Sequence, residues 1–207
     1  MLFWFRAHSQ LRNRSRDLSK QPSPRDADWP AGAVFTIGHS TLPIEAFVAV
    51  LAAYGIERLA DVRTVPRSRR NPQFNADALA TSLRAAGIDY VPLRELGGLR
   101  KPRADSPNTG WRNESFRGYA DYMQTEPFGA GLARLVEMSR ERRTAIMCAE
   151  AVPWQCHRSL IADALGARGI RVVEILSEAR YRDHALTPFA HVAGTTVSYP
   201  PMQEPLL

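Results

Sequence analysis

Residue types that perform acid–base and nucleophilic chemistry follow four short apolar runs of this 207-residue chain. The groups that close or follow these runs are, in order, Gly38-His39-Ser40, Asp61-Val62-Arg63, Arg94-Glu95 with Gly97-Gly98, and Cys148-Ala149-Glu150. Carboxylates and imidazoles transfer protons, while arginines bind anions through paired hydrogen bonds. Brought together, these groups would form a site for proton transfer on an anionic substrate.

The stretch CAEAVPWQCHR carries the most specific pattern. An apolar run leads into Cys148 and Glu150. After a short loop, Cys156, His157 and Arg158 open a predicted helix. Backbone N–H groups at a helix N-terminus, together with Arg158, predict an anion-binding site. Under the alternative, structural interpretation, His157 and Arg158 cap the loop and pair with Glu150.

Both cysteines are candidate nucleophiles. Cys156 stands at the start of a helix beside His157, where a thiol pKa is lowered, and it is the better candidate. Cys148 closes an apolar strand, a position more typical of a buried small hydrophobic residue. Arg158 lies ten residues after Cys148, which is too far for the tight phosphate cradle of thiol phosphatases and sulfurtransferases.

A zinc site would have to draw on Cys148, Cys156, His157 and His39. The chain has no C-x2-C pair, and the side chains of the adjacent residues Cys156 and His157 are expected to point in different directions. The sequence therefore predicts no metal site, and it identifies no cofactor.

The arginine-rich stretch DVRTVPRSRRNPQFN is a second candidate for binding. Residues 58–103 carry ten basic and four acidic residues, in a chain whose net charge is +6. With Phe74 and Trp111 as stacking faces, this stretch could contact the phosphates of a nucleic acid. Alternatively it is a solvated loop in which Asp61 and Arg63 pair, because the period of a strand places them on the same side.

Strand-like and helix-like segments alternate from Ala31 onward, a pattern typical of α/β proteins with a mostly parallel sheet. We expect a single three-layer, Rossmann-like domain, although the strand order does not follow from the sequence. The predicted strands are 34–38, 58–62, 88–93, 145–148 and 170–175. The predicted helices are 44–54, 76–86, 119–123, 128–142 and 156–168, and Thr41 is a possible N-cap of the first. Residues 95–117 are predicted to form a long surface loop. In such sheets ligands bind at the carboxyl ends of the strands, where the polar groups above would meet.

The domain itself is expected to span residues 31–177. Residues 1–30 have the composition of a disordered basic arm, and residues 178–207 that of a partly packed tail. Arg6 interrupts the apolar start before a secretory signal can form, and no eighteen apolar residues run together. We expect a cytoplasmic protein without membrane contact, with free thiols; the sequence does not give its oligomeric state.

Four motifs in this order, FTIGHS, DVRTVPRSRRNPQF, the ELGG loop and CAEAVPWQCHR, resemble the bacterial and archaeal domain-of-unknown-function family numbered four hundred and eighty-eight. The resemblance covers about residues 33–176. It implies an α/β domain with the motif positions His39, Ser40, Asp61, Arg63, Pro66, Ser68, Gly97, Gly98, Cys148, Glu150, Cys156, His157 and Arg158. It supplies no reaction.

The leading hypothesis is an enzyme that acts on a phosphorylated or otherwise anionic substrate, such as a nucleotide or a nucleic-acid end. Its expected catalytic residues are His39, Asp61, Glu150 and His157, its expected binding residues are Ser40, Arg63, Gly97, Gly98 and Arg158, and its candidate nucleophiles are Cys156 and Cys148. A second hypothesis is a nucleic-acid-binding module without catalysis. A third is a ligand-sensing or scaffold protein.

Overall fold

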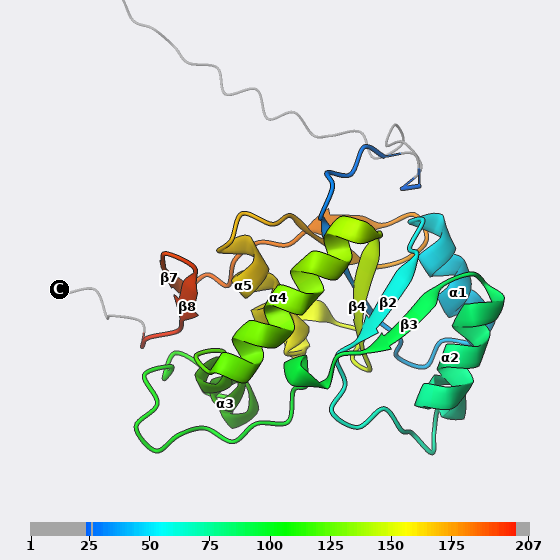
Figure 1. Cartoon of the computed structure of the whole chain (residues 1–207). Coiled ribbons are helices and arrows are strands. Elements are labelled where there is room, and N and C mark those ends of the chain that lie inside the picture. Colours follow the sequence, from blue (N-terminus) through cyan, green and yellow to red (C-terminus); the bar gives the residue numbers. More distant parts are fainter. Residues whose placement is uncertain (1–23, 26, 202–207) are drawn as a thin grey trace, which may run out of the picture.

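Five parallel strands and one antiparallel strand form the central sheet of the computed structural model, which describes residues 24, 25 and 27–201 (Figure 1). The strands are β1 (Val34–Gly38), β2 (Arg58–Asp61), β3 (Asp89–Pro92), β4 (Thr144–Cys148), β5 (Val172–Ile175) and β6 (Tyr181–Asp183). They lie in the order β3-β2-β4-β1-β5-β6, and only β6 runs antiparallel to its neighbour. The predicted mostly parallel α/β sheet is confirmed.

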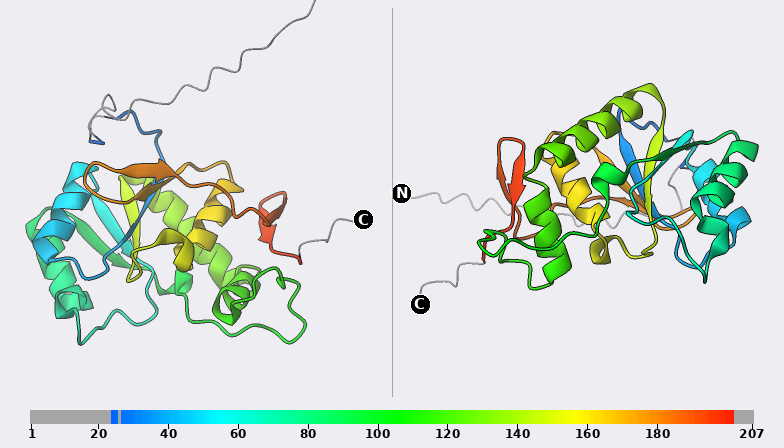
Figure 2. Two further views of the ribbon diagram at one scale, coloured as in Figure 1. Left: turned by 180° about the vertical axis from the view of Figure 1, so that it is seen from behind. Right: turned by 60° about the horizontal axis from the view of Figure 1, so that its bottom comes forward.

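Helices cover both faces of this sheet, which gives the three layers expected from the sequence (Figure 2). On one face lie α1 (Ile44–Ala53) and α2 (Ala76–Ala85); on the other lie α3 (Glu114–Tyr122), α4 (Glu126–Glu141) and α5 (Arg158–Gly166). Short 3-10 turns are η2 (Pro72–Phe74), η3 (Arg94–Leu96) and η4 (Pro153–Gln155). In the described part of the chain, no helix combines the length and hydropathy needed to span a bilayer.

The inner strands β1, β4 and β5 are buried nearly along their whole length because helices cover both faces of the sheet. In β1, Phe35 and Ile37 pack with α1 and α2, whereas Val34 packs into the core formed by α3, α4 and α5. Successive side chains of a strand point to opposite faces, so one strand serves both cores. This explains the continuous apolar runs that mark a parallel sheet in the sequence.

Helix boundaries follow the sequence signals at the C-terminal ends better than at the N-terminal ends. Gly55 and Gly87, predicted to stop the first two helices, have φ values of 62° and 74°, a left-handed conformation that glycine adopts without strain. Thr41, the expected N-cap of α1, does not cap it. The N-cap position is Pro43, and no side chain caps this helix.

The predicted surface loop over 95–117 is shorter than expected, because η3 begins it and α3 ends it. Asn113 caps α3, with its side-chain oxygen accepting a hydrogen bond of 2.8 Å from the amide of Ser115. The loop between these elements is tied down by Asp121, whose carboxylate accepts hydrogen bonds from Asn108 and Ser106. The polar composition concealed a helix start whose N-cap was visible in the sequence.

The chain after Ser177, predicted to be a partly packed tail, contributes β6 and then a hairpin of β7 (His191–Ala193) and β8 (Thr196–Ser198). Tyr199 after this hairpin is fully buried, and its hydroxyl donates to Asp163. At the other end, residues 1–23 and 26 of the predicted arm lie outside the described residues. Trp29, also assigned to that arm, is instead buried against the rings of Phe35 and Tyr181.

The position of β4 between β1 and β2 creates the crevice in which a ligand is expected. The chain leaves β1 and β2 toward the face covered by α1 and α2, but it leaves β4 toward the opposite face, where α5 lies. Loops that diverge in this way open a gap at the carboxyl ends of the strands. The functional site is therefore to be sought around the end of β4.

Candidate functional site

A cavity of about 340 Å³ opens beside the carboxyl ends of β2 and β4. Its volume lies in the range of small-molecule sites. It is lined by Arg63, Thr64, Val65, Gly98, Leu99, Ser115, Phe116, Cys148, Ala149, Glu150, Gln155, Cys156 and His157. Six of the site residues expected from the sequence are thus brought together, although they come from four separate segments of the chain.

Two thiols and an imidazole nitrogen converge in the wall of this cavity. Cys148 is the last residue of β4, Cys156 follows η4, and His157 is the N-cap residue of α5. Their sulfur atoms and one ring nitrogen all lie within 4.8 Å of one another, and the distance from Sγ of Cys156 to Nδ1 of His157 is 3.6 Å. Both cysteines are free and nearly buried, with 7% and 3% of their surfaces exposed.

The expectation that Cys156 and His157 point in different directions is wrong. Cys156 has an extended backbone, with φ −133° and ψ 145°, whereas His157 has a helical one, with φ −55° and ψ −14°. Adjacent side chains alternate only while the backbone stays extended. The bend at the start of α5 therefore turns the two side chains toward each other.

A hydrogen bond to the backbone determines which nitrogen of His157 faces the sulfur. Nε2 of His157 lies 3.1 Å from the carbonyl oxygen of Val62, which can only accept a hydrogen bond. In the neutral ring the proton is therefore on Nε2, and Nδ1 carries the lone pair. Gly98 lies over the ring, where a side chain would collide with the imidazole atoms. Gly98 thus makes room for His157.

The two thiols differ in their pKa values because one donates a hydrogen bond to the other. The hydrogen bond from Cys148 lowers the pKa of Cys156 to about 6, with the positive charge and hydrogen bonds of Arg158 acting in the same direction against the effect of burial. The same hydrogen bond, together with burial, raises the pKa of Cys148. Of the two, Cys156 is the thiol that ionises first, as expected from its position.

Arg158, which the sequence predicted to bind an anion, is buried and bonded within the protein. Its side chain is only 1% exposed and is not part of the cavity wall. The guanidinium donates to the hydroxyl of Thr36 at 2.7 Å and to the backbone carbonyl of Glu150 at 2.6 Å, and not to the Glu150 carboxylate. Gly38 leaves the space for this arrangement, since a side chain there would collide with the Glu150 carbonyl. Arg158 therefore braces the loop after β4 and places a positive charge near Cys156.

Asp61, Arg63 and His39 form a buried network behind the cavity. Asp61 accepts two hydrogen bonds from the Arg63 guanidinium, at 2.8 Å and 2.6 Å, which confirms the pairing inferred from their spacing. His39 donates from Nδ1 to the Ser40 carbonyl and accepts from Arg63 at Nε2. Of the three, only Arg63 lines the cavity. Asp61 and His39, expected to be catalytic, contact Arg63 behind the cavity wall.

Burial also fixes the charge state of His39. Removal of the ring from water lowers the pKa of His39 to about 4, and the nearby charge of Arg63 acts in the same direction. The ring is stacked on Phe74, with 4.0 Å between the ring centroids. His39 is therefore neutral near pH 7, which does not suit the proton shuttle expected from the sequence.

Ser40 and Gly97, expected to bind substrate, also serve the framework. Ser40 has a φ of 48°, and its amide donates to the Ala149 carbonyl, which joins the loops after β1 and β4. Gly97 packs closely against Thr64. Neither residue lines the cavity.

Exposed basic residues follow one segment of the cavity wall in the sequence. Arg67, Arg69 and Arg70 are exposed, and they follow directly after the wall residues Thr64 and Val65. None of these three arginines forms an ion pair with another residue in the described part of the chain. Glu150 contributes a carboxylate to the wall and is itself exposed.

The sequence did not single out the rest of the wall. Ser115 and Phe116 come from the first turn of α3, which was assigned to a loop, and the Asn113 cap was the available signal. Leu99 lies in an irregular segment and Gln155 ends the short turn η4, and neither has a distinctive sequence pattern. Phe74 and Trp111, expected to stack on nucleic-acid bases, are respectively buried against His39 and packed against Phe116.

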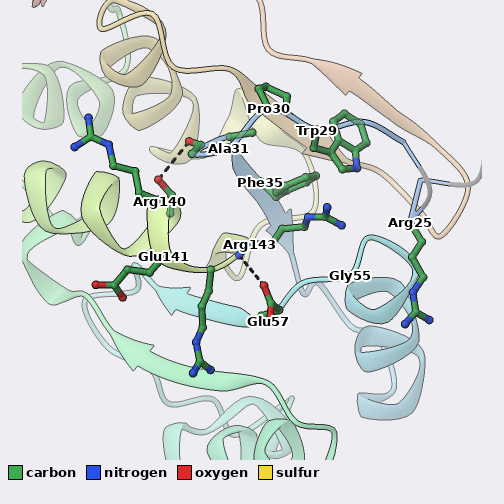
Figure 3. Close-up of a pocket in the computed structure, with 14 residues that line it drawn as sticks. Arg25, Trp29, Pro30, Ala31, Phe35, Gly55, Glu57, Arg140, Glu141 and Arg143 are labelled. Carbon is green, nitrogen blue, oxygen red and sulfur yellow. Dashed lines mark hydrogen bonds between the residues drawn. The ribbon is translucent and has the colours of Figure 1, made fainter.

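Another cavity, of about 480 Å³, lies at the opposite edge of the sheet (Figure 3). It is surrounded by Arg25 and by residues of segments 29–35, 55–57 and 139–143, at the amino ends of β1, β2 and β4. Its polar groups are largely engaged: the amide of Arg143 donates to Glu57, and the Arg143 guanidinium donates to the Tyr54 carbonyl. It has no thiol or imidazole in its wall, so it lacks the reactive groups of the first cavity.

Comparison with known proteins identifies the family of the chain but gives no activity. The chain matches no curated protein and no solved structure. The family described as "Domain of unknown function DUF488" matches residues 43–165, which include Asp61, Arg63, both cysteines and His157. As this match covers more than half of the sequence and every segment of the cavity wall, the chain belongs to the DUF488 family.

Proposed function

We propose that this protein is an enzyme that acts on a small anionic substrate, such as a phosphorylated molecule, in the cavity at the end of β4. The observation that carries the proposal is the convergence of Cys148, Cys156 and His157 in the wall of a cavity that Arg63 also lines. Buried thiols and an imidazole at hydrogen-bonding range form a reactive group, whereas a surface that only binds has no need of one.

The proposed roles follow from the positions of the side chains. Arg67, Arg69 and Arg70 attract the anion, and Arg63, held in place by Asp61, contacts it in the cavity. Glu150 is the carboxylate that can reach both solvent and substrate, which suits a general acid or base. Cys156 and His157 supply the reactive centre.

A nucleic-acid end remains within this proposal as one kind of anionic substrate. A binding module without catalysis is less well supported, because Phe74 is buried and Trp111 is packed among other rings. Without these two stacking faces, binding of single strands would depend on the arginines alone.

A screen of thermal unfolding tests the binding step. The ligands are inorganic phosphate, nucleoside monophosphates, sugar phosphates and a 5′-phosphorylated oligonucleotide. At one hundred times its dissociation constant, a ligand stabilises the fold by about 2.7 kcal/mol. The stabilisation should be lost in the triple variant R67A/R69A/R70A and kept in the matched control R84A/R112A/R140A, whose arginines are exposed elsewhere.

The catalytic step is tested with each compound that stabilises the protein. Product should form with the native chain and not with Cys156→Ser. Equal product formation by both proteins, or equal stabilisation of both triple variants, would contradict the proposal. Binding of oligonucleotides alone, with an affinity that falls steeply with salt and without turnover, would favour the binding module instead.

A further inference from the structure

We infer that Cys148, Cys156 and His157 bind one zinc ion and leave its fourth coordination position open to the cavity. The role of this ion as the reactive centre rests on the proposed function. Its binding rests on the donor geometry alone.

The distances among the donors fit a tetrahedral zinc site. With Zn–S bonds of about 2.3 Å and Zn–N bonds of about 2.0–2.1 Å, neighbouring ligand atoms of a tetrahedron lie roughly 3.5–3.8 Å apart. Sγ of Cys156 and Nδ1 of His157 are 3.6 Å apart, and all three donor atoms lie within 4.8 Å of one another. A single ion between them needs only a small movement of Cys148.

His157 is prepared for this role by the groups around it. Histidines that bind a metal with one nitrogen usually donate the other N–H to a carbonyl or carboxylate, which fixes the ring. Here Nε2 is held by the carbonyl oxygen of Val62, so the lone pair of Nδ1 is directed at the sulfur atoms. Gly98 packs against the ring beside Nδ1, where any larger residue would collide with the imidazole.

The donor set and its surroundings favour a zinc ion with an open position. Two thiolates and an imidazole are ligands that zinc prefers, and three protein ligands with one free position are typical of zinc sites that act on substrates. All three donor residues line the cavity, so the free position faces it. With both thiolates, the zinc ion and the guanidinium of Arg158 counted together, the centre has a charge of +1, which would attract an anionic substrate.

The same geometry would also permit a metal-free pair of thiols that oxidises to a disulfide. Formation of the Cys148–Cys156 bond would remove two electrons and two protons, which requires an external oxidant such as a peroxide. A zinc ion bound to both sulfur atoms should slow their alkylation. A pair of thiols that binds no zinc should be alkylated at the same rate with and without added zinc.

The first test measures zinc itself in the full chain, purified without an affinity tag of histidines. Zinc is removed with a chelator, the protein is kept reduced, and zinc is returned in competition with a chromophoric chelator. One equivalent should bind per chain. Zinc should also protect both cysteines from iodoacetamide, as measured by mass spectrometry on the native protein, a readout that needs no variant.

The second test assigns the ligands. Cys148→Ser, Cys156→Ser and His157→Ala should each weaken zinc binding by at least about 100-fold, because even the partners that only orient a ligand contribute about 10–100-fold. His191→Ala, which removes an exposed histidine of β7, is the matched control and should leave the affinity unchanged. Cobalt(II) in place of zinc should give a thiolate charge-transfer band that is lost with either cysteine.

Failure of the inference can be told apart from failure of the proposed function. Absence of zinc binding under reducing conditions, binding that survives both cysteine replacements, or unprotected thiols in the presence of zinc would overturn the metal site. If anion turnover then persists without zinc, the proposed function stands without the ion. If zinc binds as described but no anion stabilises or reacts, the metal site stands and the proposed function fails.

Discussion

The carbonyl oxygen of Val62 lies 3.1 Å from Nε2 of His157 and thereby selects the nitrogen that faces Cys156. Val62 directly follows β2, whereas His157 is the N-cap residue of α5. One hydrogen bond thus couples the end of the second strand to the start of the last helix. The reactive cluster depends on the ring being held in this orientation, which makes the groups that pack on the ring the most informative targets for mutation.

Gly98→Ala should displace His157, because the added methyl group would collide with the ring. We expect a loss of about 1–3 kcal/mol in the free energy of unfolding, as for other overpacked buried positions, together with weaker zinc binding. Gly129→Ala is the matched control: nothing lies within 4 Å of its added methyl group in α4, and it should stabilise the helix by about 0.5–1 kcal/mol. Urea denaturation of both variants checks this. Unchanged stability of Gly98→Ala would show that the ring moves aside freely.

Arg158→Lys should destabilise the fold by about 1–3 kcal/mol, since a single ammonium cannot replace both hydrogen bonds of the guanidinium, to Thr36 and to the Glu150 carbonyl. Arg140→Lys, at an exposed position of α4, should have no measurable effect. Chemical denaturation gives the comparison. Normal stability with a selective loss of anion binding would instead restore the role predicted from the sequence.

His184 should make the fold less stable in alkaline solution. Burial alone would lower its pKa, but hydrogen bonds with Asp163 and Glu174 outweigh burial and raise it to about 9. The stabilisation is therefore complete below the unfolded pKa of about 6.5 and is lost as the pH rises through about 9. Of the order of 2 kcal/mol should disappear over this interval. Denaturation between pH 6 and 9.5 should show the loss in the native chain but not in His184→Gln.

His39 should show the opposite behaviour. Its pKa is lowered to about 4, chiefly by burial, so the neutral ring stabilises the fold above pH 6.5, and this contribution is lost as the pH falls toward 4. Nitrogen NMR of the histidine rings should find His39 neutral at pH 5, with its proton on Nδ1. A titration midpoint near 6.5 would mean that solvent reaches the ring.

The rule that ligands bind at the carboxyl ends of strands predicted from the sequence that certain side chains meet, and Arg63, Glu150, Cys156 and His157 do line one cavity. The rule does not say which way a polar side chain turns once its strand ends. Asp61 and His39 turn inward because Arg63 and Phe74 engage them, and Arg158 turns inward because Gly38 leaves room for it. These choices depend on partners that are distant in sequence.

The order of the strands in the sheet also could not be predicted from the sequence. The residues of β4 do not show which strands lie beside it, because β1 and β5 are buried apolar runs of the same kind. The expectation that Cys156 and His157 point in different directions was wrong for a local reason. An extended residue followed by a helical one places both side chains on the same side, and residue types do not reveal a backbone bend of one residue.

The late arrival of β4 at the middle of the sheet has a consequence for biosynthesis. During synthesis β1, β2 and β3 emerge from the ribosome before β4 is made. In the folded protein, however, β1 and β2 both pair with β4 and not with each other. Until residues 144–148 emerge, the two earlier strands have no neighbour on the sides that face each other. The amino-terminal half should therefore be unable to form its sheet as a nascent chain, and Cys148 arrives with the strand that completes it.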